Sequence, residues 1–486
     1  MARKKRKTVL SQVTLEKYAA EGKSIARLED GKTLFVEGGV PGDIVEVLVL
    51  KNKSSYAEGK VMRIETPSPN RVDAFCTHFG ICGGCKWQML PYDLQIEYKA
   101  QQVEDQLKRI GRVALPPFMP IAGSSETQFY RNKLEFTFSA RSYLTKEELD
   151  AATGQEIIHK SALGFHAPGM FDKVVDVGTC YLQPEPTNIL KNLMRTMSKE
   201  MDLPYYDFKL QQGWLRNLMI RVATTGEILV NLVVHHERPE LKVLLDAMLV
   251  TVPEITSLNY TINPKVNDSI YDLEVNCYHG RPYIEEVLGD YRFKISPKSF
   301  FQTNSKQAKI LYDITKSFAG LTGTEVVYDL YCGTGSIGIY CSKDAKSIIG
   351  IEVVEDAIKD AKENAKLNNV ENAIYYAGDV SKIVDEAFFE KHGKPDVIIT
   401  DPPRAGMTEK LIQQLLQIEA PKVVYVSCNP ATQARDLALL DAKYSVEKVQ
   451  PVDMFPHTHH IENVVLLQLK PQIEDDSIII ENDLIL

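Results

Sequence analysis

VVYDLYCGTGS, residues 326–336, is the stretch that decides the fold of this 486-residue chain. An apolar run carries Asp329 near its end, and a turn with Gly333 and Gly335 leads from it into a helical pattern that begins at Ser336. Glycines in such a turn let the backbone bend tightly and approach a ligand without a Cβ in the way. A strand that enters a helix through this turn predicts a doubly wound, Rossmann-like α/β sheet.

The same alternation of apolar run and helical segment continues down the chain. Further β-type runs are SIIGIEV, AIYYAGD, DVIITD and VVYVSC, at residues 347–353, 373–379, 396–401 and 423–428. Continuous apolar runs of this length are typical of strands buried on both faces of a parallel sheet. We therefore expect one α/β domain over residues 301–470, followed by an acidic tail over residues 471–486.

Upstream of that domain the chain is rich in short β-type runs. Before the linker TPSPN, residues 66–70, these runs alternate with turn signals and predict a five-strand barrel over residues 1–67. Residues 71–300 combine a helix at about 94–110 with a strand-rich stretch, which predicts a central α+β domain. Its expected strands are EFTFSA, ALGFH, LMIRVAT, EILVNLVV and SLNYTIN, and its other helices lie near residues 187–199 and 241–249.

Bulk composition is that of a globular protein. Hydrophobic residues make up 44% and charged residues 25%, and no apolar run reaches the roughly 18 residues that a membrane span needs. The start, MARKKRK, has no apolar stretch behind it, so we expect no signal peptide and a cytoplasmic location. In that compartment the eight cysteines stay reduced, and a cluster of them indicates metal binding or catalysis.

The net charge of −9 is unevenly distributed. The tail after Lys470 holds five acids and no base, whereas residues 1–70 carry four more basic than acidic residues. A basic front is the surface that phosphate contacts need, although a lysine-rich terminus is as often a solvated end. The acidic total is therefore compatible with RNA binding.

Three successive strands of the predicted sheet end near acids: Asp329, Glu352 and Asp379. Glu352 stands close to where an acid meets ribose hydroxyls in nucleotide-binding sheets. Carboxylates at this edge would repel phosphate, and the third glycine of a dinucleotide site is missing. A ligand with ribose and adenine but no phosphate fits better, and S-adenosylmethionine is such a ligand. The alternatives are a dinucleotide site and a glycine turn kept only for packing.

Two more strand ends carry unusual sequences. Asp401-Pro-Pro-Arg-Ala-Gly406 holds an aspartate at the sheet edge, and Val426-Ser-Cys-Asn-Pro430 places Cys428 in a turn. A lone cysteine is most often a small buried hydrophobe, but a polar turn at this edge favours a reactive one. Phe455-Pro-His-Thr-His-His-Ile-Glu462 lacks the i, i+4 spacing of a helical zinc pair, so a base or a structural turn is expected there.

Three cysteines, Cys76, Cys82 and Cys85, lie within ten residues in the pattern Cys-x5-Cys-Gly-Gly-Cys. In a reducing compartment this grouping indicates a metal site rather than chance burial. Cys180 is the best candidate for a fourth ligand, and both zinc and a 4Fe–4S cluster accept four thiolates. The spacing differs from the Cys-x3-Cys-x2-Cys of radical enzymes, so we expect a structural or RNA-contact role.

Four motifs together resemble the signatures of the RNA uracil-5-methyltransferases. They are Phe300-Phe-Gln-x-Asn304, Asp401-Pro-Pro-Arg-Ala-Gly, Val426-Ser-Cys-Asn-Pro-Ala-Thr and Phe455-Pro-His-Thr-x-His-x-Glu462. The front barrel is similar to a TRAM domain, so the resemblance covers the chain to about Leu469. His459 stands where relatives usually have glycine, and Ser336 where some have asparagine.

The resemblance implies a role for each matched residue. Cys428 would be the nucleophile, Glu462 the base and Asp401 a contact to uracil. S-adenosylmethionine would be held at the glycine turn and the strand ends, by Gln302, Tyr331, Gly333, Gly335, Ser336, Glu352, Asp379 and Asp401. Family members that methylate large-subunit ribosomal RNA carry the same Cys-x5-Cys-Gly-Gly-Cys, which favours a 4Fe–4S cluster over zinc and 23S rRNA over transfer RNA as the partner.

Such residues suit methylation of uracil carbon 5, which is a poor nucleophile. A thiolate that adds at carbon 6 makes an enolate, and its carbon 5 can attack a sulfonium methyl before a base removes the carbon 5 proton. The uridine must leave its stack, so we expect a flipped-out base in a loop or single strand. No obligate protein partner and no membrane contact are expected.

Two other functions fit parts of the pattern. Asp401-Pro-Pro resembles the acid-Pro-Pro-aromatic loop of amino-methyltransferases, but Arg404 replaces the aromatic residue and that chemistry has no use for Cys428. A non-catalytic ribosome-assembly factor would keep the fold only to bind RNA. The presence of Cys428, Glu462 and Asp401 together speaks against that function.

Overall fold

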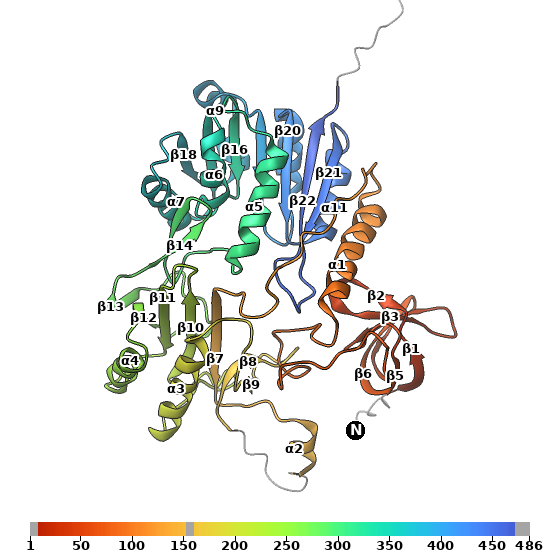
Figure 1. Cartoon of the computed structure of the whole chain (residues 1–486), viewed down its shortest axis with the longest axis vertical. Coiled ribbons are helices and arrows are strands. Elements are labelled where there is room, and N and C mark those ends of the chain that lie inside the picture. The colour runs from red at the N-terminus through yellow and green to blue at the C-terminus, as the bar shows by residue number, and fades with distance from the viewer. Residues whose placement is uncertain (1–7, 152–159, 472–486) are drawn as a thin grey trace, which may run out of the picture.

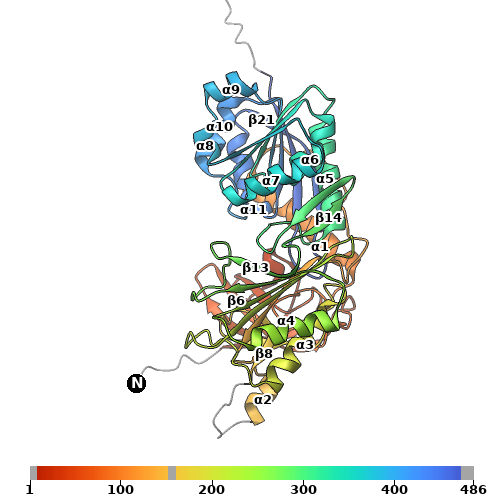
Figure 2. The same cartoon turned by 90° about the vertical axis from the view of Figure 1, so that its left-hand side faces the viewer.

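The computed structural model describes residues 8–151 and 160–471 and arranges them in three domains (Figure 1). The N-terminal and central domains lie together at one end, and the C-terminal α/β domain forms the other end (Figure 2). The basic stretch 1–7 and the acidic tail from residue 472 lie outside the described residues. No helix in the described part is both long and apolar enough to cross a membrane.

The N-terminal domain is a sheet of six strands, where five were expected. Its order is β1-β5-β6-β4-β3-β2; residues 9–14 form a strand beside β5, a two-residue strand pairs with β3, and the other four strands lie over residues 24–66. Alternating residues such as Leu34, Val36, Val45 and Val47 form its core. The strands are β1 (Val9–Thr14), β2 (Lys17–Tyr18), β3 (Ser24–Arg27), β4 (Thr33–Glu37), β5 (Ile44–Asn52) and β6 (Tyr56–Thr66), with a short turn of helix at Ala20–Gly22.

A long helix connects the N-terminal part of the chain to the C-terminal domain. The helix predicted at 94–110 is confirmed as α1 (Tyr92–Gln106), which continues as the wider turn η2 (Leu107–Gly111). It ends where Arg112 takes a left-handed backbone conformation, φ 54°. The helix packs against α11 (Pro430–Leu440) and β21 (Tyr444–Val452) of the C-terminal domain (Figure 1).

The central domain is a seven-stranded sheet in the order β13-β12-β11-β10-β7-β8-β9. All five predicted strands are present, and β11–β12 is the one parallel pair among those described. The helices α3 and α4 pack together beside the sheet (Figure 2). The elements are β7 (Lys133–Ser139), α2 (Lys146–Ala151), β8 (Ala162–His166), β9 (Val174–Asp176), α3 (Thr187–Glu200), β10 (Leu215–Val222), β11 (Ile228–Val234), α4 (Glu240–Thr251), β12 (Ile255–Ile262) and β13 (Val275–Gly280).

The C-terminal domain confirms the predicted doubly wound α/β sheet. Its order is β18-β17-β16-β19-β20-β22-β21; the first five strands are parallel, and β22 is antiparallel to both neighbours. The strands are β16 (Val326–Leu330), β17 (Ser347–Glu352), β18 (Ala373–Ala377), β19 (Val397–Thr400), β20 (Lys422–Ser427), β21 and β22 (Glu462–Leu469). The helices are α5 (Ser305–Ala319), α6 (Ser336–Cys341), a short turn at Ser342–Asp344, α7 (Glu355–Leu367), α8 (Val380–Ile383), α9 (Glu386–His392), α10 (Glu409–Ile418) and α11.

A hairpin precedes this sheet and packs into the same core. It consists of β14 (Ile284–Leu288) and β15 (Tyr291–Ile295), and its Phe293 is buried in one cluster with residues of α5 and β16. Strand β15 also contacts helix α7. The hairpin therefore shares its hydrophobic core with the C-terminal sheet, although the sequence division at residue 300 assigns it to the central domain.

Candidate active site

Three side chains meet at the carboxyl edge of the parallel strands. Asp401 follows β19, Cys428 follows β20, and Glu462 begins β22. Because Ser427 pairs with Asn463 in the antiparallel ladder, continuing that register by one residue sets Cys428 opposite Glu462. The pairing of β19 with β20 brings Asp401 to the same edge. The structure therefore brings together the three residues that the sequence singled out for chemistry.

Low solvent exposure governs the ionisation of this group. Burial raises the pKa of Asp401 to about 7 and raises that of Glu462, only 5% exposed, well above the ordinary value of a glutamate. Burial, and then the nearby carboxyls of Glu462 and Asp401, raises the pKa of Cys428 to about 11. The pocket thus favours the neutral forms of the Cys428 thiol and the Glu462 carboxyl.

Arg404 is the cationic side chain that lowers the pKa of both Cys428 and Glu462. Its backbone carbonyl accepts hydrogen bonds from the side chains of Asn429 (2.9 Å) and Thr432 (3.1 Å), which tie the turn after β19 to the start of α11. Its guanidinium contacts the imidazole of His460. The sequence places Arg404 and His460 within two of the family motifs but assigns neither residue a role of its own.

The glycine turn between β16 and α6 has a left-handed backbone at three positions. They are Tyr331 (φ 60°), Gly333 (φ 52°) and Gly335 (φ 77°). A Cβ on Gly335 would lie 3.0 Å from atoms of Ala361 and Tyr375, so this glycine allows close packing of the turn on the sheet. A Cβ on Gly333 would meet nothing within 4 Å, so the backbone there faces open space that a ligand can approach.

The acids at the strand ends differ in their surroundings. Asp329 is 1% exposed, accepts a hydrogen bond from the Gly338 amide (2.9 Å) and has its pKa raised to about 7 by burial, so it braces the turn. Glu352 ends β17, accepts from the amides of Gly333 (3.3 Å) and Val354 (3.0 Å) and remains partly exposed. Asp379 lies two residues beyond β18, where it is exposed and caps α8 through Ser381.

Two further predicted residues lie where α5 meets the glycine turn. The Ser336 hydroxyl is 2.8 Å from the Tyr312 hydroxyl of α5, whereas Gln302 lies three residues before that helix. The Gln302 carbonyl accepts a hydrogen bond from Asn132 of the central domain (2.9 Å). Tyr312 was missed because it occupies the buried face of an amphipathic helix, where sequence alone indicates packing.

The four predicted metal-binding cysteines line one cavity. Cys76, Cys82 and Cys85 approach it from the segment before α1, and Cys180 from the central domain. Burial, followed by the other thiols of the group, raises the pKa of Cys85 to about 12. Within residues 8–151 and 160–471, no three His, Cys, Asp or Glu side chains converge in the way that a single metal ion requires.

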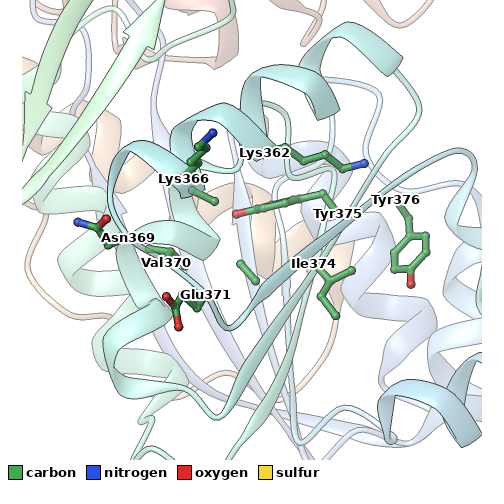
Figure 3. A pocket seen from close by; sticks show the side chains of 10 residues that line it. Lys362, Lys366, Asn369, Val370, Glu371, Ile374, Tyr375 and Tyr376 are labelled. Carbon is green, nitrogen blue, oxygen red and sulfur yellow. The ribbon is translucent and has the colours of Figure 1, made fainter.

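A surface groove between α7 and β18 lies apart from these residues (Figure 3). Lys362 and Lys366 of α7 line it, together with Ile374, Tyr375 and Tyr376 of the edge strand. None of the predicted catalytic, cofactor or metal residues lines this groove. We therefore assign the chemistry to the carboxyl edge of the sheet and not to this groove.

Comparison with family models matches two parts of the chain. Residues 278–470 match the tRNA (Uracil-5-)-methyltransferase family, and residues 3–62 match the TRAM domain. The first match begins at residue 278, upstream of the hairpin β14–β15, in agreement with the shared core.

Close relatives extend over almost the whole chain. An uncharacterized RNA methyltransferase of Bacteroides thetaiotaomicron is 51% identical over 93% of this chain and 100% of its own length, and one of Porphyromonas gingivalis is 50% identical over 92% and 98%. The crystal structure of Pyrococcus abyssi tRNA (uracil-54, C5)-methyltransferase in complex with S-adenosyl-L-homocysteine superposes with a TM-score of 0.70. It has 27% identity and covers 94% of this chain and 100% of that one.

Proposed function

The chain belongs to the RNA uracil-5-methyltransferase family and carries its TRAM domain, and from that premise we propose that Cys428 is the nucleophile, Glu462 the base and Asp401 the uracil contact. The enzyme methylates carbon 5 of uracil in RNA and uses S-adenosylmethionine. The observation that carries the proposal is the meeting of Cys428 and Glu462 across β20 and β22 at the sheet edge.

In the proposed reaction the Cys428 thiolate adds to carbon 6 of a flipped-out uracil. Carbon 5 of the resulting enolate attacks the sulfonium methyl group that bound S-adenosylmethionine would supply, and S-adenosylhomocysteine would leave as the carbon–sulfur bond breaks. Glu462 then removes the proton from carbon 5, the carbon 5–carbon 6 double bond reforms, and the thiolate leaves. Asp401 orients the uracil ring, either as the protonated acid or as a carboxylate that accepts a hydrogen bond from the ring N–H.

The charge balance of the pocket supports this order of events. Burial raises the pKa values of Cys428, Glu462 and Asp401, and the nearby Arg404 offsets this only in part for Cys428 and Glu462. A sulfonium cation in that pocket favours the charged forms of the thiol and the carboxyls. Activation of Cys428 is thereby coupled to the presence of the methyl donor.

We assign cofactor contacts to the glycine turn and the adjoining strand ends. The open space before Gly333 admits the ligand, and the partly exposed carboxylates of Glu352 and Asp379 are suited to accept hydrogen bonds from ribose and adenine. Gln302, Tyr331, Gly335 and Ser336 complete the set.

We also propose that Cys76, Cys82, Cys85 and Cys180 hold a 4Fe–4S cluster. Four thiols around one cavity match the ligand number of such a cluster, and the resemblance of the cysteine pattern favours a cluster over zinc. When bound, the cluster would cross-link the segment before α1 to the central domain. Its role would then be structural or in RNA contact.

The RNA substrate proposed from the cysteine pattern is 23S rRNA. The second candidate is transfer RNA, because the matching family model and the Pyrococcus enzyme are both named for it. Mass mapping of 5-methyluridine in rRNA and tRNA from cells lacking the gene decides between them. Loss from 23S rRNA alone supports the first, and loss from tRNA alone overturns it.

The mechanism is tested with target RNA that contains 5-fluorouridine. The unmodified enzyme should form a covalent protein–RNA band that survives denaturation, because fluorine cannot leave as a proton does. Cys428→Ala should form no such band and no methylated product. Cys277→Ala, which alters an exposed thiol of β13, is the matched control and should behave as the unmodified enzyme. Normal turnover by Cys428→Ala would exclude the mechanism.

A further inference from the structure

The loop that precedes Glu462 is held from outside the catalytic domain. Residues 453–461 connect β21 to β22, and their first residue, Asp453, pairs with Lys99 of α1 at 2.6 Å. Both side chains are completely shielded from solvent. The same ammonium group donates a second hydrogen bond, to the Phe455 carbonyl (3.0 Å). One lysine thus fixes two points of the loop.

Two more residues of α1 hold the loop from the same helical face. Tyr92, Gln95 and Lys99 are spaced by three and four positions, so their side chains project together. The Tyr92 hydroxyl donates to Asp453 (2.8 Å), and the Gln95 carbonyl oxygen accepts from the His457 amide (2.8 Å). The contacts of α1 with the loop therefore span five loop positions, from Asp453 to His457.

The segment after the cysteine cluster adds a third set of bonds. The amides of Lys86 (2.8 Å) and Trp87 (3.0 Å) both donate to the His457 carbonyl. His457 has a left-handed backbone, φ 62°, a conformation that a non-glycine residue adopts only when its surroundings impose it. The loop therefore takes part of its shape from contacts outside the catalytic domain, in addition to the bonds that Asn304 (3.0 Å) and Gln307 (2.8 Å) of that domain donate to the carbonyls of Met454 and Asp453.

A buried ion pair contributes little to the free energy of unfolding. The cost of removing both charges from water offsets their attraction, and apolar replacements of similar size are often equally stable. A pair of this kind is better suited to fix geometry. Here the loop leads directly into Glu462 and carries His460, whose ring contacts Arg404.

We propose that Lys99, with Gln95 and Tyr92, is a positioning residue that places Glu462 for removal of the carbon 5 proton. The inference rests on the base role assigned to Glu462 above. Lys99 touches no reacting atom. It acts through Asp453 and Phe455 on the loop, and so the step it serves is release of the product from Cys428 and not the addition or the methyl transfer.

The test follows two events in one turnover, with RNA that carries tritium at carbon 5 of the target uridine. Lys99→Met should transfer the methyl group at a rate within about threefold of the unmodified enzyme. Tritium release should slow at least tenfold, and methylated RNA should accumulate as a covalent adduct. Lys99→Arg, which keeps the cation, should recover part of the release rate. The proposal would be overturned if folded Lys99→Met slowed methyl transfer and tritium release equally, or if it slowed neither.

Two further variants separate positioning from loss of stability. Lys99→Met/Asp453→Leu removes both charges and should regain thermal stability relative to Lys99→Met while release stays slow. Arg216→Met removes a fully buried cation that serves carbonyls of the central domain, and it should lower the melting temperature without changing the ratio of methyl transfer to tritium release. Recovery of release in the double variant, or slowed release in Arg216→Met, would show that stability alone governs the step.

Gln95→Met keeps the experiment decisive if Lys99→Met does not fold. It removes the bond to the His457 amide and introduces no unpaired charge, so the same slow release is expected. Normal release by Gln95→Met would then count against the inference. Because the fluorouridine adduct tests Cys428 and the Glu462→Gln variant tests the base, each independently of Lys99, failure here leaves Cys428 and Glu462 in their roles.

Discussion

The guanidinium of Arg404 lies 3.3 Å from Nδ1 of His460, and the contact joins the turn after β19 to the loop before β22. Burial, followed by the neighbouring His459 and Arg404, lowers the pKa of His460 to about 3. The imidazole is therefore neutral at physiological pH and can accept a hydrogen bond from the guanidinium. The cation remains beside Cys428 and Glu462, whose pKa values it lowers.

Removal of this cation should change the pH dependence of methylation. The reaction needs the Cys428 thiolate, and Arg404→Met should raise the thiol pKa further above about 11 because a stabilising positive charge is lost. The rising limb of kcat/KM against pH should then move to higher pH. At pH 7.5 the thiolate fraction, and with it the rate, should fall roughly tenfold for every pH unit that the limb moves.

Arg404→Lys is the matched control for that experiment. It keeps the positive charge, so the limb should stay closer to that of the unmodified enzyme, although a lysine donates to His460 with different geometry. A profile for Arg404→Met that coincides with the unmodified one would show that Arg404 does not tune the thiol.

The two glycines of the cofactor turn should respond differently to alanine. Gly335→Ala places a Cβ 3.0 Å from Ala361 and Tyr375 in a left-handed conformation, so it should lower the melting temperature and also weaken binding of S-adenosylhomocysteine. Gly333→Ala meets no protein atom and should cost only the left-handed backbone penalty, about 1–2 kcal/mol. Its loss of affinity, measured by calorimetry, should exceed its loss of stability. Unchanged affinity in Gly333→Ala would mean that the ligand does not approach this residue.

The α/β domain was predictable because its signal is local. Runs such as 347–353 and 423–428 are apolar throughout, and the structure places β17 and β20 within one residue of those bounds. Cys428 and Asp401 were recognisable for the same reason, since each follows such a run directly. The strands β21 and β22 were not identified, because they form a consecutive antiparallel pair with no helix between them and so do not follow the strand–helix alternation of the other strands.

The surroundings of the site could not be predicted from the sequence. Lys99 and Asp453 are 354 positions apart, and nothing local marks a lysine of an amphipathic helix as buried. The same holds for Tyr312 against Ser336. The small strands β1, β2, β14 and β15 were missed or merged because two to six residues give little periodicity.

The proposed cluster gives a prediction about metal content. Protein purified without exposure to air should be brown and contain about four irons with matching sulfide. Cys180→Ala should lose the metal, because that thiol lines the cavity with the other three. Cys277→Ala, at an exposed thiol of the edge strand β13, should keep it. Stoichiometric zinc without iron would contradict the cluster.

The TRAM domain gives a prediction about RNA affinity. Lys23 and Lys60 line a groove that also contains Lys86 and His459, on the side of the molecule where the cysteine segment meets the N-terminal sheet. Replacing both Lys23 and Lys60 by Gln should weaken RNA binding and reduce the slope of log affinity against log salt by about 1.4. Affinity for S-adenosylhomocysteine should not change, and Lys242→Gln in α4 should leave both quantities as they are. An unchanged salt slope would place the RNA elsewhere.

Glu462→Gln separates the base from the nucleophile. The variant keeps the size of the side chain and leaves Cys428 free to add to carbon 6, so methyl transfer should still occur once. Glutamine cannot take the carbon 5 proton, and the methylated RNA should therefore remain bonded to the enzyme. A denaturing gel should show a slow protein–RNA band that carries label from the methyl group of S-adenosylmethionine, whereas Cys428→Ala/Glu462→Gln should show none. Multiple turnovers by Glu462→Gln at the unmodified rate would assign the proton to another group, and Asp401, the other carboxyl at this edge, would be the next to replace.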